Sequence, residues 1–122
     1  MSKRFETFDE FWPFYLGEHR NPVCRGLHIW GSSLGVATLV GGIVTMTWWS
    51  FPLAMTIGYA HAWVGHFFFE HNKPATFQAP WFSFMGDWKM IALFYRGKLS
   101  AELERLYGST HPTADAPLRT PR

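Results

Sequence analysis

The feature that decides the fold is an uncharged run over residues 26–69, which reads GLHIWGSSLGVATLVGGIVTMTWWSFPLAMTIGYAHAWVGHFFF. None of its 44 residues is Asp, Glu, Lys or Arg, yet three of them are histidines. The run is about twice the ~20 residues that one helix needs to cross a bilayer. Because backbone polar groups in lipid must be satisfied within the chain, we predict an all-α, membrane-embedded protein.

A break is expected near the middle of this run, where residues 48–52 read WWSFP. Ser50 can cap a helix, and Pro52 suits a first helical turn, where its missing N–H would have no partner. We therefore predict a helical hairpin with spans at about residues 27–47 and 51–69. A buried hairpin in a soluble protein is the alternative, but the remaining sequence is too short to wrap two such helices.

The charges near the run predict its orientation. Arg20 and Arg25 precede the first span, and the second span is followed by Lys73, Lys89, Arg96 and Lys98. The turn between the spans carries no charge. By the positive-inside rule, we expect an integral membrane protein with both termini in the cytoplasm. The net charge of +2 is slight, and we expect no nucleic-acid partner.

The segments around the hairpin predict shorter helices. Thr7 begins a capping box and is followed at helical spacing by four aromatic residues, Phe8, Phe11, Trp12 and Tyr15. We expect the resulting helix to lie at the membrane interface. Residues 81–96 are expected to form an interfacial or re-entrant helix that closes over the histidine end of the hairpin. Residues 100–107 suit a short polar helix. We predict one domain over residues 1–107 and a proline-containing disordered tail over residues 108–122.

Small residues recur four positions apart in the first span, as in Gly31 and Gly35, and again as Gly58 and Ala62 in the second. Such faces let helices approach closely in lipid. The pattern suits packing within the hairpin, and it suits homodimerisation equally well.

The histidines are expected to meet at one end of the hairpin. The midpoint between His28 and His66 is position 47, close to the predicted turn, so an antiparallel hairpin places them at a similar depth. The break at Asn21-Pro22 returns His19 to the same region. Glu70 follows His66 by one helical turn. Three histidines and one carboxylate are therefore expected to converge.

Imidazole and carboxylate ligands together suit divalent iron, zinc or manganese, and a non-haem iron centre also needs open positions for oxygen and substrate. His61 and His71 are further candidate ligands, and a π-bulge near Gly65 would be needed to bring His61 into line. Residues that could orient the imidazoles are chosen by proximity in sequence: Glu18, Asn21, Asn72 and Asp87.

Two stretches are similar to signatures of a known family. Residues 8–28 read FDEFWPFYLGEHRNPVCRGLH, and residues 58–80 read GYAHAWVGHFFFEHNKPATFQAP. Over about residues 5–98, the chain resembles a short bacterial-type member of the small membrane proteins that include the fungal 2-hydroxy fatty acid dioxygenase. That enzyme depends on iron and removes one carbon from 2-hydroxy fatty acids with molecular oxygen, a form of α-oxidation.

The resemblance implies a catalytic Fe(II) site and a fatty-acid-like lipid substrate, and its bacterial-type branch implies a bacterial inner membrane. His19 matches the histidine of H-x-N-P, His28 matches the histidine in the first span, and His66 and Glu70 match G-H-x-x-x-E. His61 and His71 match the pattern less clearly. Two other functions remain open: a haem-binding electron carrier with His28 and His66 as axial ligands, and a non-catalytic membrane scaffold.

Overall fold

The computed structural model describes residues 5–119, and within that range it contains helices and no strand. The all-α prediction is therefore confirmed. In chain order the elements are α1 (Phe8–Gly17), α2 (Pro22–Val44), α3 (Ser50–Val64), the π-helix η1 (Gly65–Glu70), the 3₁₀-helix η2 (Ala75–Phe77), α4 (Pro80–Tyr95) and α5 (Leu99–Tyr107).

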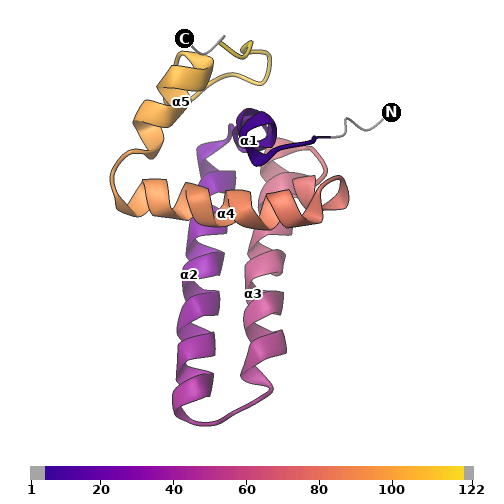
Figure 1. The fold of residues 1–122 in the computed structure, drawn as a ribbon, viewed down its shortest axis with the longest axis vertical. Helices are drawn as coiled ribbons and strands as arrows, with labels where there is room; N and C mark the ends of the chain where they lie inside the picture. Colours follow the sequence, from indigo (N-terminus) through magenta and orange to yellow (C-terminus); the bar gives the residue numbers. More distant parts are fainter. Residues whose placement is uncertain (1–4, 120–122) are drawn as a thin grey trace.

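Helices α2 and α3 form the predicted antiparallel hairpin, which extends away from the other helices (Figure 1). Asn21 caps α2, because its side chain accepts a hydrogen bond from the Val23 amide at 2.8 Å. The two helices pack closely at Gly31, where an added Cβ would lie 2.5 Å from the Cβ of His61. A larger residue at position 31 would therefore push the helices apart.

The turn at the far end of the hairpin differs from the prediction in one detail. Ser50 does not cap α3 but is its first residue, and its hydroxyl donates to the Thr47 carbonyl at 2.7 Å. The reason is that the turn closes on itself: the Thr47 amide donates to the Gly42 carbonyl at 2.7 Å, and Met46 adopts a left-handed φ of 55°. The Ser50 hydroxyl is thus used inside the turn.

Among the described residues, α2 is the one helix that is long and apolar enough to cross a membrane by length and composition. Only 28% of its most apolar window is buried. The α-helical part of α3 has 15 residues and continues into η1. Large apolar side chains are exposed along α2, α3, their turn and η1, among them Trp30, Val40, Ile43, Val44, Trp48, Trp49, Phe51 and Phe68.

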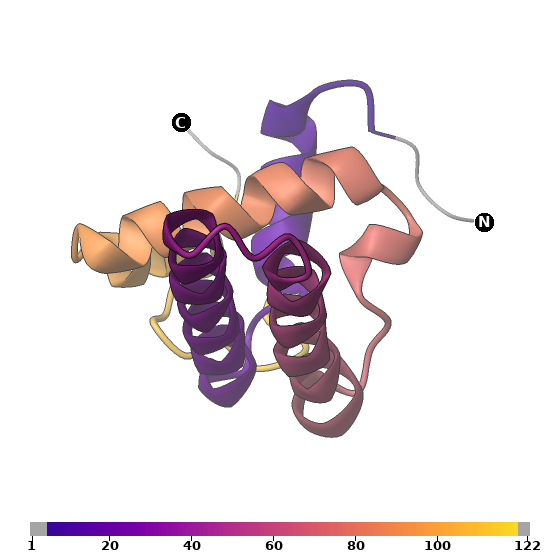
Figure 2. The same ribbon diagram turned by 90° about the horizontal axis from the view of Figure 1, so that it is seen from below.

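Most of the hydrophobic core lies outside the hairpin, where α1, α4 and α5 pack together, and α2 contributes Ile29 to it. Helix α4 crosses the hairpin, and α1 lies at its base (Figures 1 and 2). Phe11, Trp12 and Tyr15 of α1 are at most 2% exposed and pack with Met90 and Leu103. These α1 aromatics are therefore covered by apolar partners from α4 and α5, and the expected position of α1 at the membrane interface stays a prediction.

Residues 108–119 pass close to the start of the hairpin. The Arg20 guanidinium donates to the backbone carbonyls of Thr113, Ala114 and Ala116 at 2.6–3.0 Å. Arg25 is buried and donates to the Thr110 carbonyl at 3.2 Å. Arg20 and Arg25, which we used above to predict the orientation in the membrane, thus bind the backbone of the C-terminal segment. The disorder predicted for residues 108–122 stays a prediction, and residues 120–122 lie outside the described range.

Candidate metal centre

Three histidines from three different segments meet in the interior of the protein. His19 Nε2 lies 3.1 Å from His28 Nε2 and 3.0 Å from His66 Nε2. The three imidazoles pack edge to face, with ring centroids 4.4–4.9 Å apart. Each of these side chains is at most 4% exposed. The expected convergence of the three histidines is confirmed.

The local structure explains how each histidine reaches the cluster. His19 follows the end of α1, just before the Asn21 cap turns the chain into α2. His28 lies in the second turn of α2. His66 lies in the π-helix that begins at Gly65, and an added Cβ at Gly65 would lie 2.9 Å from Cys24 Sγ. This glycine lets the chain around His66 approach the part of α2 that carries His28.

The other ring nitrogen of each histidine has its own acceptor. His19 Nδ1 lies 2.6 Å from the Tyr15 carbonyl, and His28 Nδ1 lies 2.9 Å from the Cys24 carbonyl. His66 Nδ1 lies 2.7 Å from Oδ1 of Asn72, whose Nδ2 donates to the Glu18 carbonyl at 3.1 Å. Because these partners are acceptors, the proton of each neutral imidazole belongs on Nδ1.

This arrangement fits a metal ion. With every Nδ1 protonated, the three Nε2 atoms present lone pairs toward one another, and these repel unless a cation lies between them. The ligand atoms lie within 4.8 Å of one another. Neutral imidazoles that bind the metal through one ring nitrogen and donate the N–H of the other to carbonyl or amide oxygens are the usual form of histidine metal ligands.

The surroundings of His19 favour its neutral form. Burial, together with His28 and His66, holds the pKa of His19 well below its ordinary value. The ring of Tyr15 stacks on the imidazole with centroids 4.1 Å apart. The Tyr15 hydroxyl donates to Asp87 on α4. A neutral imidazole is the form that binds metals, so this environment prepares His19 as a ligand.

The other predicted ligands lie outside this cluster of described residues. The Glu70 carboxylate accepts a hydrogen bond from the Asn21 amide. His61 Nδ1 donates to the Ile57 carbonyl at 2.7 Å. His71 ends η1 in a left-handed conformation and is exposed. A π-helix does begin at Gly65, where a π-bulge would have been needed to align His61, but the cluster contains His66 and not His61.

The four residues predicted to orient the imidazoles have different roles in the structure. Asn72 contacts His66 directly, and the Glu18 carbonyl holds Asn72. Asp87 acts on His19 only through Tyr15, and the Asn21 side chain caps α2. The sequence interpretation missed two acceptors, the backbone carbonyls of Tyr15 and Cys24. Each precedes its histidine by four residues, a helical spacing that could have indicated them.

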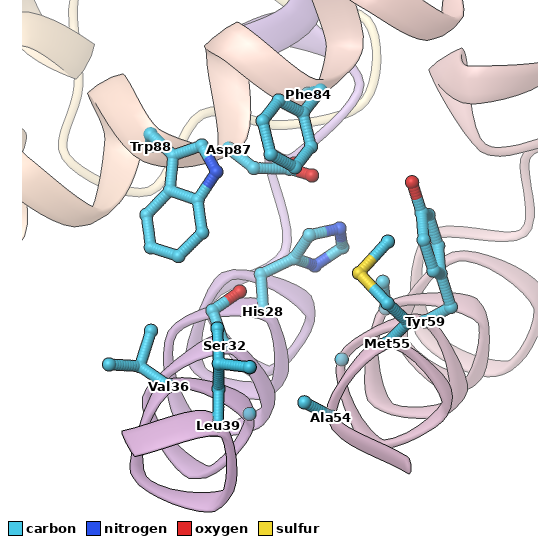
Figure 3. Close-up of a pocket in the computed structure, with 13 residues that line it drawn as sticks. His28, Ser32, Val36, Leu39, Ala54, Met55, Tyr59, Phe84, Asp87 and Trp88 are labelled. Atoms are coloured by element: carbon cyan, nitrogen blue, oxygen red, sulfur yellow. The ribbon is translucent and has the colours of Figure 1, made fainter. Parts of the chain in front are cut away.

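An apolar groove opens beside the cluster, between α2 and α3 and under α4 (Figure 3). Its cavity volume is about 110 Å³. The lining comes from α2 (His28, Ser32, Gly35, Val36 and Leu39), α3 (Ala54, Met55, Gly58, Tyr59 and Ala62) and α4 (Phe84, Asp87 and Trp88). His28 thus belongs both to the three-histidine cluster and to the groove.

The fold and the site together define an all-helical protein with a candidate metal centre. The hairpin has an apolar exterior, and the buried three-histidine cluster lies where it joins the other helices. The chain belongs to the 2-hydroxy-palmitic acid dioxygenase Mpo1-like family, whose model matches residues 5–99. That range contains all three histidines. Comparison with curated proteins and with solved structures gives no match.

Proposed function

We propose that this protein is a membrane-embedded non-haem iron dioxygenase that shortens 2-hydroxy fatty acids, or a related lipid, by one carbon. The observation that carries the proposal is the convergence of three Nε2 lone pairs whose Nδ1 atoms all have acceptors. The family name supplies the reaction class. The carboxyl carbon leaves as carbon dioxide, the hydroxyl-bearing carbon becomes the new carboxyl carbon, and one water forms, so that atoms and electrons balance with molecular oxygen and without an external reductant.

In this proposal His19, His28 and His66 hold the metal. A ferrous ion bound there would coordinate the carboxylate and hydroxyl oxygens of the substrate and would activate molecular oxygen. Asn72 and the two backbone acceptors keep the imidazoles in the orientation that metal binding needs. Three-histidine sets also bind zinc, so the choice of iron rests on the oxygen chemistry of the family.

We also propose that the hairpin lies in the membrane with both termini in the cytoplasm. The exposed surfaces of α2 and α3 are apolar, as lipid requires, whereas the helices outside the hairpin have a buried core of their own. Trp48 and Trp49 are exposed at the turn, where an aromatic belt would meet the far interface. The proposed site then lies where the hairpin joins the other helices.

The two other functions that the sequence left open are less well supported. Two axial histidines need a porphyrin between them, but the rings of His28 and His66 are 4.9 Å apart and a third imidazole contacts both. A non-catalytic scaffold has no use for three buried imidazoles with separate acceptors. Such groups are costly to bury, which favours a functional role.

The proposed reaction can be tested with detergent-purified protein loaded with ferrous iron under anaerobic conditions. Incubation with 2-hydroxyhexadecanoic acid and oxygen should give the acid that is one carbon shorter, detected by mass spectrometry. Unhydroxylated hexadecanoic acid is the matched control and should react poorly, because it offers the metal only its carboxylate. Equal turnover of the two acids, or product formed without oxygen, would contradict the proposal.

A further inference from the structure

The groove beside His28 follows the hairpin axis away from the three-histidine cluster. On α2 its lining begins at His28 and ends at Leu39, eleven residues further along, which is about 16 Å of helix. This length is about half of the ~30 Å hydrocarbon thickness of a bilayer. The groove is therefore as deep as one leaflet of lipid tails.

The chemical character of the groove changes along its length. His28, Ser32 and Asp87 supply polar groups at the end near the cluster (Figure 3). Farther along, toward the turn, the lining from α2 and α3 is Val36, Leu39, Ala54 and Met55. A ligand that is polar at one end and hydrocarbon along the rest matches this arrangement.

We propose that this groove binds the acyl chain of the substrate, with the carboxyl end at His28 and the methyl end toward the hairpin turn. The inference rests on the proposed function, because the three-histidine site fixes which end of the lipid enters first. Phe84 and Trp88 of α4 cover the groove near the cluster and hold the first methylenes against α2 and α3. Chain-length preference is then set by the residues of the hairpin.

Gly58 is the residue at which this proposal can be tested most directly. It lines the groove, and an added Cβ there would meet no atom within 4 Å. The substitution Gly58→Leu therefore places the first side-chain carbon in open space and adds apolar volume to the groove lining. Gly41 on α2 is the matched control, because it is equally open but does not line the groove. Both substitutions replace a helical glycine by the same residue.

The first measurement is turnover of 2-hydroxy acids of increasing chain length by iron-loaded protein. Gly58→Leu should lower kcat/KM for the C16 acid by about tenfold, since displacing two methylenes from an apolar site costs about that factor. It should affect a C8 acid much less and leave metal per chain unchanged. Gly41→Leu should keep the wild-type chain-length profile. Equal losses for both acids, or equal effects of the two variants, would overturn the proposal.

The second measurement separates the groove from the reaction. A 2-hydroxyhexadecanoic acid with a photoreactive diazirine in mid-chain is irradiated with the protein in nanodiscs without oxygen, and the labelled peptides are mapped. Labels should fall on the segments around Val36, Leu39 and Met55, and Gly58→Leu should reduce them. If the labels fall on these segments but the protein gives no turnover with oxygen, the groove is supported and the proposed reaction is refuted. Turnover with labels only on the outer hairpin surface would refute the groove and leave the reaction intact.

Discussion

The ring of Tyr15 lies nearly parallel to the imidazole of His19, with centroids 4.1 Å apart and planes at 26°, while its hydroxyl donates to Asp87. Tyr15 is fully buried, and Asp87 belongs to α4. The contact therefore connects a proposed metal ligand near the end of α1 to the helix that covers the groove. Helix α4 approaches Tyr15 closely at Gly86, where an added Cβ would lie 2.7 Å from the tyrosine ring.

Loss of the Tyr15 hydroxyl should destabilise the fold and spare the metal. Tyr15→Phe keeps the ring on His19 but leaves the buried Asp87 carboxyl without this donor, which costs about 1–3 kcal/mol. Chemical denaturation in detergent should show this loss, with metal per chain unchanged. Tyr95→Phe is the control, because its hydroxyl bonds to Ser33 at an exposed position. If Tyr15→Phe is as stable as the wild type, the Asp87 contact is unimportant.

Asp87 should make the stability of the protein depend on pH. Burial raises the pKa of its carboxyl to about 7, from an ordinary value of 3.8. Between about pH 4 and pH 7 the folded state holds a proton that the unfolded state has released. The contribution of Asp87 to the free energy of unfolding is therefore full below about pH 4 and is lost as the pH rises through about 7. Asp87→Asn resembles the protonated acid and should remove this slope. At pH 8 the variant should be more stable than the wild type, and a steeper slope would contradict the assignment.

Asn72 should affect metal affinity without being a ligand. Its Oδ1 accepts from His66 Nδ1, and removing such an orienting acceptor typically costs about 10–100-fold in metal affinity. Asn72→Ala should show this loss in a competition titration with a metal-binding dye. Asn72→Asp keeps an acceptor oxygen and should retain more affinity than Asn72→Ala. The reverse order of the two variants would rule out the proposed role.

Both ends of the chain should lie on the cytoplasmic side of the membrane. Arg20 and Arg25 precede the hairpin and Lys73 follows it, whereas the turn carries no charge. Reporter fusions at the N- and C-terminus should therefore both give the cytoplasmic signal, with a fusion in the turn giving the opposite one. Termini on opposite sides would show that only one helix crosses the membrane.

The sequence predicted the hairpin and the meeting of the three histidines because both follow from simple geometry. An uncharged run with one break has few ways to fold in lipid, and positions 28 and 66 are equidistant from that break. The position of His19 also followed, since Asn21 and Pro22 form a recognisable helix start.

Other features could not be predicted because they depend on contacts between distant segments. The burial of Phe11 and Trp12 depends on α4 and α5, whose packing is not visible in the local pattern. The Glu70 carboxylate accepts from the backbone amide of Asn21, which lies 49 residues earlier in the chain. This contact is not visible in the sequence, where only the four-residue spacing from His66 suggested that Glu70 is a ligand. The ligand roles of Glu70, His61 and His71 stay predictions, and single substitutions are their test.

Metal per chain in single histidine variants tests the central claim most directly. The protein should be loaded with ferrous iron anaerobically, since zinc generally binds more tightly than ferrous iron, and the bound metal measured by mass spectrometry. His19→Ala, His28→Ala and His66→Ala should each lose most of the iron, while His111→Ala, an exposed histidine outside the cluster, should retain it. Full iron content in all three cluster variants would contradict the three-histidine site.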